Sequence, residues 1–274
     1  MPQAHSFLYS APRRDYKRLP TPASPRDPEA NLQLRIALQD LGFEFGETIL
    51  NFPADDVTFD LLPREQLREV ELPFVDRNDI LAATTRPPLS DGRQGDKKKI
   101  EPANTTIERM IFDHYFRYFR VCSRSHVELT EEAAALLPPA MKNRAIMTFY
   151  QEGCRYMYLQ ARGRPRSRRS PLGQRTAAFL LRVEEIWPGG PGLVAAWSLN
   201  AMATLSWCLQ LRHRYSWMLE NRGLTMVELH PERSPAHANS YAWVRDWRVT
   251  PVFDTGGELP PRSDEERRLP LAFD

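Results

Sequence analysis

Arginine side chains are concentrated in one short segment of this 274-residue chain. The segment Arg162-Gly163-Arg164-Pro165-Arg166-Ser167-Arg168-Arg169 holds five arginines in eight residues, and no acidic residue occurs from Arg162 to Arg182. A guanidinium group offers a planar fork of donors that fits phosphate oxygens, and its charge favours polyanions. The sequence therefore predicts a nucleic-acid or other polyanion site formed by Arg162, Gly163, Arg164, Pro165, Arg166, Arg168 and Arg169.

Residues 162–165 read Arg-Gly-Arg-Pro and resemble the core of an AT-hook. In such a motif glycine lets the backbone approach the floor of a narrow minor groove, and the flanking arginines reach into its negative potential. The segment differs from the motif because no proline precedes Arg162 and because there is a single copy. The alternative is a solvated loop that only reflects the chain's strong preference for arginine over lysine.

Composition limits the chemistry that the chain can perform. The net charge is +2, so a nucleic-acid site must be a local patch, and only five lysines are available for Schiff-base or phosphate-loop chemistry. Three cysteines at wide spacing contain no Cys-x-x-Cys pair, which predicts neither a disulfide framework nor a zinc site. We expect a cytoplasmic protein without a cofactor or a metal ion.

A glycine-rich turn is the second candidate site. Gly190-Pro191-Gly192-Leu193-Val194-Ala195 matches Gly-x-Gly-x-x-Ala between a predicted strand and a predicted long helix, a context in which amides at a helix N-terminus bind a pyrophosphate. Glu228 follows at the end of the next predicted strand and could bind a ribose. Gly190, Gly192 and Glu228 therefore form an alternative cofactor-binding set, and a tight turn without a ligand is the simpler interpretation.

The histidines give less specific patterns. Glu228, His230 and His237 could form a carboxylate–imidazole metal set, although a proline-rich loop of this composition is more typical of plain turns. Arg120 and His126 have a spacing that resembles the motif of HEPN ribonucleases, over too few residues to be specific. Since no nucleophile stands in a recognisable setting, we assign no catalytic residue and leave open whether the protein is an enzyme.

The periodicity of hydrophobic residues predicts the helices and strands of the chain. It predicts helices over 28–41, from residue 105, from Thr130 and over 193–220, and strands over 155–160, 177–187, 224–229 and 241–249. Strands 155–160 and 177–187 should pair, with the arginine segment at the tip. We expect an α/β or α+β fold with a mostly antiparallel sheet and a long central helix. The predicted divisions are a proline-rich region (1–104), a mixed core domain (105–255) and a polar tail (256–274).

Residues 186–211 carry no charge and are long enough to cross a bilayer. Prolines and glycines at the start, with Asn200 and Gln210 further along, favour the interior of a folded domain over a membrane span. We therefore expect no membrane partner. The leading hypothesis is a nucleic-acid-associated accessory protein that binds phosphate without catalysis. A nucleotide-binding enzyme or sensor and a protein-interaction module are the alternatives.

Overall fold

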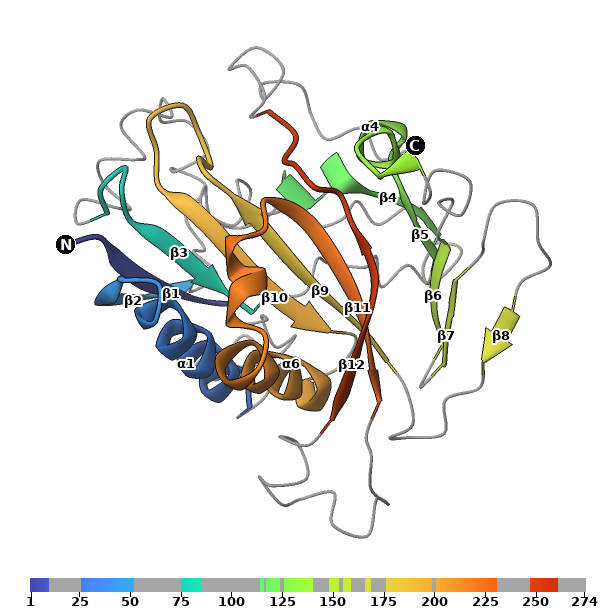
Figure 1. Ribbon diagram of the computed structural model, residues 1–274, viewed down its shortest axis with the longest axis horizontal. Helices are drawn as coiled ribbons and strands as arrows, with labels where there is room; N and C mark the ends of the chain where they lie inside the picture. Colours follow the sequence, from blue (N-terminus) through green and yellow to red (C-terminus); the bar gives the residue numbers. More distant parts are fainter. Residues whose placement is uncertain are drawn as a thin grey trace, which may run out of the picture.

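Strands and helices make up most of the part of the chain that the structure describes. The computed structural model describes residues 1–9, 26–51, 75–84, 114–115, 117–123, 126–139, 148–152, 155–158, 166–168, 176–198, 201–230 and 247–260. These residues form two β-sheets, here named sheet A and sheet B, with two helices packed side by side on one face of sheet A (Figure 1).

Sheet A has seven strands in the order β12-β11-β9-β10-β3-β1-β2. Parallel pairing joins β2, β1, β3 and β10, whereas β9, β11 and β12 pair antiparallel to their neighbours, so the sheet is mixed. The strands are β1 (Gln3–Tyr9), β2 (Glu44–Asn51), β3 (Ile80–Ala83), β9 (Thr176–Val183), β10 (Gly192–Ser198), β11 (Gly223–His230) and β12 (Arg248–Asp254).

Helix α1 (Arg26–Gln39) joins the parallel strands β1 and β2 and packs on one face of sheet A. Ala30, Leu34, Ala37 and Leu38 are fully buried, and their spacing of three to four residues places them on one side of the helix. Gly42, with φ of 89°, ends this region in a left-handed conformation that glycine adopts without strain. The helix predicted over 28–41 is thereby confirmed.

Helix α6 (Ala201–His213) lies beside α1 on the same face (Figure 1). Every residue from Ala203 to Leu211 is buried, because sheet A, α1 and the 3-10 helix η2 (Ser216–Glu220) pack around this helix. The indole nitrogen of Trp207 donates to the carbonyl oxygen of Phe179 in β9 at 2.9 Å. This bond satisfies the polar atom of a fully buried tryptophan and connects α6 to the middle of the sheet.

Aromatic rings fill the core on the opposite face of sheet A. The ring centroids of Tyr115 and Trp197 lie 4.7 Å apart, and those of Phe179 and Trp197 lie 5.3 Å apart. Helix α4 (Glu131–Ala135) also contributes to this core, and Thr130 caps it by accepting a hydrogen bond from the amide of Ala133. The predicted helix start at Thr130 is therefore confirmed.

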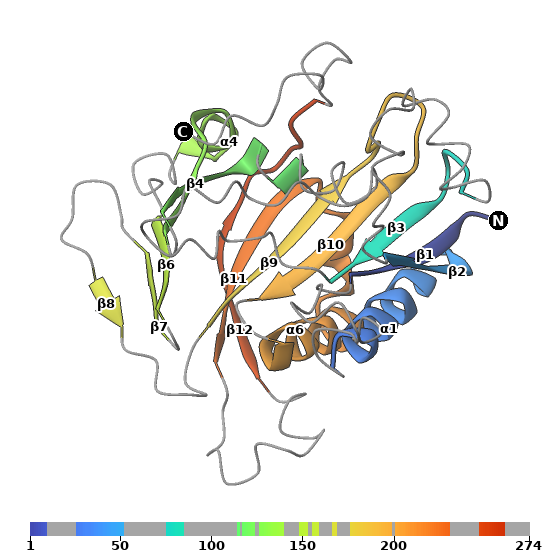
Figure 2. The ribbon, with the colours of Figure 1, turned by 180° about the vertical axis from the view of Figure 1, so that it is seen from behind.

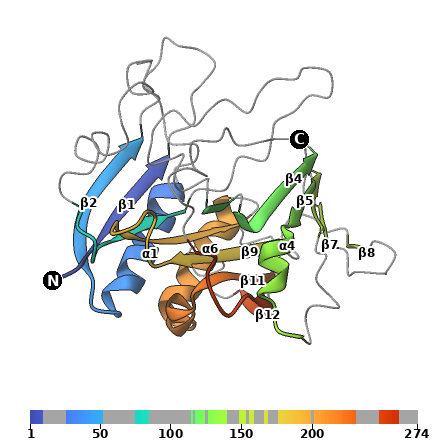
Figure 3. The ribbon, with the colours of Figure 1, turned by 90° about the horizontal axis from the view of Figure 1, so that it is seen from above.

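Sheet B has five antiparallel strands in the order β4-β5-β6-β7-β8 and lies on the β11–β12 side of sheet A (Figure 2). Seen from above, it occupies the end of the molecule opposite β1 and β2 (Figure 3). Its strands are β4 (Phe119–Ser123), β5 (His126–Leu129), β6 (Thr148–Glu152), β7 (Arg155–Tyr158) and β8 (Arg166–Arg168).

The long helix predicted over 193–220 is wrong. Residues 193–198 belong to strand β10, and the helical part is divided into α6 and η2. Every residue of β10 is buried, because helices cover one face of this central strand and aromatic residues the other. A strand buried on both faces has a continuous apolar sequence, which periodicity cannot distinguish from a buried helix.

The predicted pairing of strands 155–160 and 177–187 is also wrong. Strand β7 pairs with β6 and β8 in sheet B, whereas β9 pairs with β10 and β11 in sheet A. Strands from both sides of the boundary predicted at residue 104 belong to one sheet, because β1, β2 and β3 share sheet A with β9 to β12. The proline-rich region supplies three of its strands.

The other sequence predictions are met in part. The strand predicted over 224–229 lies within β11, and the mixed α/β class is confirmed. The strand predicted over 241–249 falls mostly outside the described residues, as do most of the helix from residue 105 and the polar tail. Among the described segments, no helix is both long and apolar enough to cross a bilayer; α6 has 13 residues.

Candidate functional site

The arginine-rich segment lies around an edge hairpin of sheet B. Strand β8 pairs antiparallel with β7, and residues 159–165 join the two strands. Arg166 and Arg168 are in β8, whereas Arg162, Gly163, Arg164, Pro165 and Arg169 lie outside the described residues. In the described part of sheet B, β8 is one of the two edge strands. The hairpin therefore places two arginine positions on an edge strand. Its strands are β7 and β8, whereas the sequence predicted a hairpin of 155–160 and 177–187.

The register of this hairpin brings two residue types together. Tyr156 is the partner of Arg168, and Tyr158 is the partner of Arg166. Directly opposite residues in an antiparallel pair share one face of the sheet. The register therefore sets each of the two tyrosine positions opposite an arginine position, with the Met157–Ser167 pair between them. We call the two tyrosines and the two arginines the Tyr–Arg ladder.

The Gly190–Ala195 turn does not have the setting of a nucleotide site. It joins β9 to strand β10, so no helix begins there, and the hypothesis loses the helix N-terminus on which it depends. The amides of Ile186 and Gly190 donate to the carbonyls of Pro191 and Trp187, both at 2.8 Å. A Cβ atom at Gly190 would lie 2.4 Å from the Trp187 ring, which explains this glycine by packing.

Glu228 lies far from the turn with which the nucleotide hypothesis combined it. It is the register partner of Ala177 at the start of β9, whereas Gly192 follows the end of that strand. Strand geometry separates Ala177 from Val183 by about 20 Å. Gly190, Gly192 and Glu228 therefore do not form one site, and we correct that prediction.

Glu228 and His230 do form a buried pair. They stand two residues apart on β11, and Nε2 of His230 lies 2.9 Å from Oε2 of Glu228. Each residue keeps 8% of its surface exposed. His237, the third member of the predicted metal set, lies outside the described residues, which contain no group of three potential metal ligands. A carboxylate in contact with an imidazole is suited to proton chemistry.

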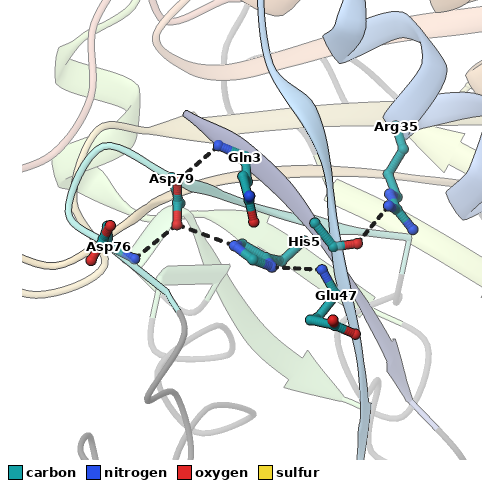
Figure 4. Close-up of polar contacts among 7 residues, drawn as sticks. Gln3, His5, Arg35, Glu47, Asp76 and Asp79 are labelled. Carbon is teal, nitrogen blue, oxygen red and sulfur yellow. Dashed lines mark hydrogen bonds and ion pairs between the residues drawn. The ribbon is translucent and has the colours of Figure 1, made fainter. Parts of the chain in front are cut away.

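A second histidine–carboxylate pair lies between the first strands of sheet A (Figure 4). Nε2 of His5 lies 3.1 Å from Oδ2 of Asp79, and Nδ1 of His5 accepts a hydrogen bond from the amide of Glu47 at 3.0 Å. Asp79 also accepts hydrogen bonds from the amides of Gln3 and Asp76, both at 2.8 Å. Since both ring nitrogens of His5 are engaged, this network connects β1, β2 and β3 and leaves no lone pair for catalysis.

Arg35 of α1 completes the contact with β2. It donates to the carbonyl of Gly46 at 2.7 Å and lies over the Phe45 ring, 4.6 Å from its centroid. Partial burial lowers the pKa of this guanidinium, and nearby Glu47 acts in the opposite direction. His5, Asp79 and Arg35 were not predicted from the sequence. The only signal was a polar residue, Asp79, directly before the apolar run 80–83.

Two further side chains have restricted chemistry. Burial raises the pKa of the Cys208 thiol, so it stays protonated and is a poor nucleophile. Burial also raises the pKa of Tyr118 to about 12. Arg120 and His126, whose spacing resembles the HEPN motif, lie on the neighbouring strands β4 and β5.

Comparisons with protein families, with curated proteins and with solved structures found no match to this chain. The fold defines a mixed α/β protein with a seven-stranded sheet and a second, antiparallel sheet at one side.

Proposed function

We propose that this protein binds single-stranded nucleic acid through the β7–β8 hairpin. The observation that carries the proposal is the register of the Tyr–Arg ladder, in which Tyr156 and Tyr158 pair with Arg168 and Arg166. Proteins that bind single strands combine cationic groups along the phosphate backbone with aromatic rings on which bases stack. The ladder pairs both residue types by register at the edge of a sheet.

The remaining arginines of the segment extend the same basic surface along the chain. Arg162 and Arg164 lie within the connection between β7 and β8, and Arg169 follows β8 directly. No acidic residue occurs from Arg162 to Arg182, so no neighbour in the sequence neutralises them. A polyanion that reaches the ladder would therefore meet five guanidinium groups within eight residues.

Fluorescence anisotropy with a labelled single-stranded oligonucleotide of about 20 nucleotides tests the proposal. Replacing Arg166 and Arg168 by glutamine should weaken binding at least about tenfold, because two charge-assisted contacts to phosphate are lost. The matched control is the double substitution R77Q/R214Q, which removes the same charge from two exposed arginines on other segments. Equal losses in both variants would show non-specific charge attraction and would contradict a site at the hairpin.

The tyrosines give an independent test. The double variant Y156A/Y158A should weaken single-strand binding by about 1–3 kcal/mol for each base that stacks. Binding to duplex of the same length should change little, because paired bases cannot stack on these rings. If both substrates lose affinity equally, the ladder does not distinguish single strands, and the single-strand part of the proposal is wrong.

A further inference from the structure

The buried pair of Glu228 and His230 continues an apolar row of strand β11. Alternate residues of a strand share a face, and Leu224 and Met226 precede the pair on the same face with no exposed surface. Removing a carboxylate and an imidazole from water costs free energy that alkyl side chains at these positions would not incur. The hydrogen bond of 2.9 Å between them offsets part of that cost.

The contact with Glu228 determines which nitrogen of His230 carries the proton in the neutral ring. A carboxylate only accepts hydrogen bonds, so Nε2 must be the donor and Nδ1 keeps its lone pair. Among the described residues, no group donates to Nδ1. An imidazole held in one tautomer by a buried carboxylate, with a lone pair on the other nitrogen, is the arrangement of a general base.

A cationic residue stands beside this base on the neighbouring strand. Arg248 of β12 is the register partner of His230, and Thr250 is the partner of Glu228. Both β12 residues are exposed, so they line the polar end of the β11–β12 ladder that solvent reaches. A guanidinium next to a proton acceptor suits a substrate whose reacting group is a phosphate, because it stabilises negative charge on the phosphate oxygens.

We propose that His230 is the general base of an RNA-cleaving site, with Glu228 as its positioning residue and Arg248 as the phosphate-binding residue. This inference rests on the proposed binding of single-stranded nucleic acid. Sheet B, which carries the Tyr–Arg ladder, lies next to the edge of sheet A that is formed by β11 and β12 (Figures 1 and 2). A strand bound at the hairpin therefore lies on the side of the molecule that carries the base.

The reaction is an internal transesterification. Nδ1 of His230 takes the proton of a ribose 2′-hydroxyl, and the 2′-oxygen forms a bond to phosphorus as the bond to the 5′-oxygen breaks. The leaving 5′-oxygen takes a proton from water, and the resulting hydroxide removes the proton from His230. The products are a 2′,3′-cyclic phosphate and a 5′-hydroxyl, with no net consumption of water. DNA is not a substrate, because it lacks the 2′-hydroxyl.

The test uses the full chain and three labelled oligonucleotides of one sequence, each about 20 nucleotides long: RNA, DNA and 2′-O-methyl RNA. Binding is measured by anisotropy, and cleavage by gel electrophoresis with mass analysis of the ends. We expect cleavage of RNA alone, with cyclic-phosphate and 5′-hydroxyl ends. RNA that is fully bound yet stays intact would overturn the cleavage inference and leave the proposed binding in place. RNA that is neither bound nor cleaved would refute both.

Single substitutions test whether His230 is the general base. His230→Gln keeps a side-chain amide that can donate to Glu228 but has no basic nitrogen, so the rate should fall by about 100- to 10,000-fold with RNA affinity unchanged. His213→Ala, at an exposed histidine, is the control and should cleave at the original rate. Cleavage that survives in H230Q would overturn the proposal and would indicate another active residue or a contaminating nuclease.

Glu228→Gln tests the positioning role. The amide oxygen can still accept the hydrogen bond from Nε2, but the negative charge that stabilises a protonated imidazole is lost. We expect kcat to fall at least about tenfold while KM changes little, since the substrate is bound by other residues. A variant that unfolds at a lower temperature but keeps its kcat would show a purely structural pair and would contradict the proposal.

Discussion

His5 and Asp79 are 74 residues apart in the sequence and form a buried hydrogen bond of 3.1 Å at the start of two parallel strands. The carboxylate of Asp79 accepts three hydrogen bonds, from the His5 ring and from the amides of Gln3 and Asp76. Three donors, two of them in β1 and one in the turn before β3, therefore depend on one side chain that only accepts. This arrangement explains why an acidic residue can be buried at the start of β3.

Asp79→Asn should destabilise the protein clearly. Asparagine has a single acceptor oxygen, so its amide group would face a donor, and at least one buried donor would lose its partner. We expect the free energy of unfolding to fall by about 1–3 kcal/mol or more in urea denaturation. Asp76→Asn is the matched control, because Asp76 is exposed and contributes its amide to the network. A loss of stability as large in D76N as in D79N would contradict this explanation.

Gly46→Ala should disturb the same network from the side of β2. A Cβ atom at this position would lie 2.4 Å from Nδ1 of His5, a distance that forces the ring or the strand to move. We expect a loss of about 1–3 kcal/mol in the free energy of unfolding. Gly257→Ala serves as the control, since a Cβ atom there would have no neighbour within 4 Å. A neutral G46A variant would show that His5 can shift freely.

Ala203→Leu should overpack the interface between α6 and its surroundings. Ala203 is fully buried among the residues that join α1, α6 and sheet A, so a larger side chain would have to displace packed neighbours. The expected cost is about 1–3 kcal/mol in the free energy of unfolding, measured by thermal or urea denaturation. Ala201→Leu, at a partly exposed position of the same helix, should cost much less. Equal effects would indicate a loosely packed core.

Alkaline pH should destabilise the fold through its buried tyrosines. Burial raises the pKa of Tyr118 to about 12 and that of Tyr115 further, whereas an unfolded tyrosine titrates near pH 10. Between these values the folded protein binds more protons than the unfolded one, so stability is present below a pH of about 10 and is lost as the pH rises. The ultraviolet absorbance of tyrosinate should show part of the nine tyrosines ionising only with unfolding. Complete ionisation in the folded protein would contradict their burial.

The sequence predicted elements with clear local signals and failed where tertiary context decided. Helix α1 has apolar residues at helical spacing and a terminal glycine, and β11 has a run of branched and apolar residues, so both were recognised. Strand β10 was assigned to a helix because burial on both faces removes the alternation of a strand. Strand β3 has four residues, which is too short a run to detect without its partners.

For the candidate sites too, the features set by local sequence were predicted, and those set by tertiary contacts were not. Glycines before an apolar run suggested a phosphate-binding turn. The residues after these glycines form strand β10, so no helix N-terminus with its partial positive charge is present there. Glu228 and His230 were named from their spacing, and their contact depends only on the alternation of a strand, which is a local property. The partnership of His5 and Asp79 depends on the parallel pairing of β1 and β3, which spacing along the chain does not predict.

The salt dependence of binding tests the central claim most directly. The logarithm of the affinity for a single strand should fall linearly with the logarithm of salt concentration, with a slope of about −0.7 for each phosphate contacted. The variant R166Q/R168Q should lose two contacts and become less steep by about 1.4, whereas R77Q/R214Q should keep the original slope. A slope that is unchanged in R166Q/R168Q, or one that changes equally in both variants, would contradict nucleic-acid binding at the β7–β8 hairpin.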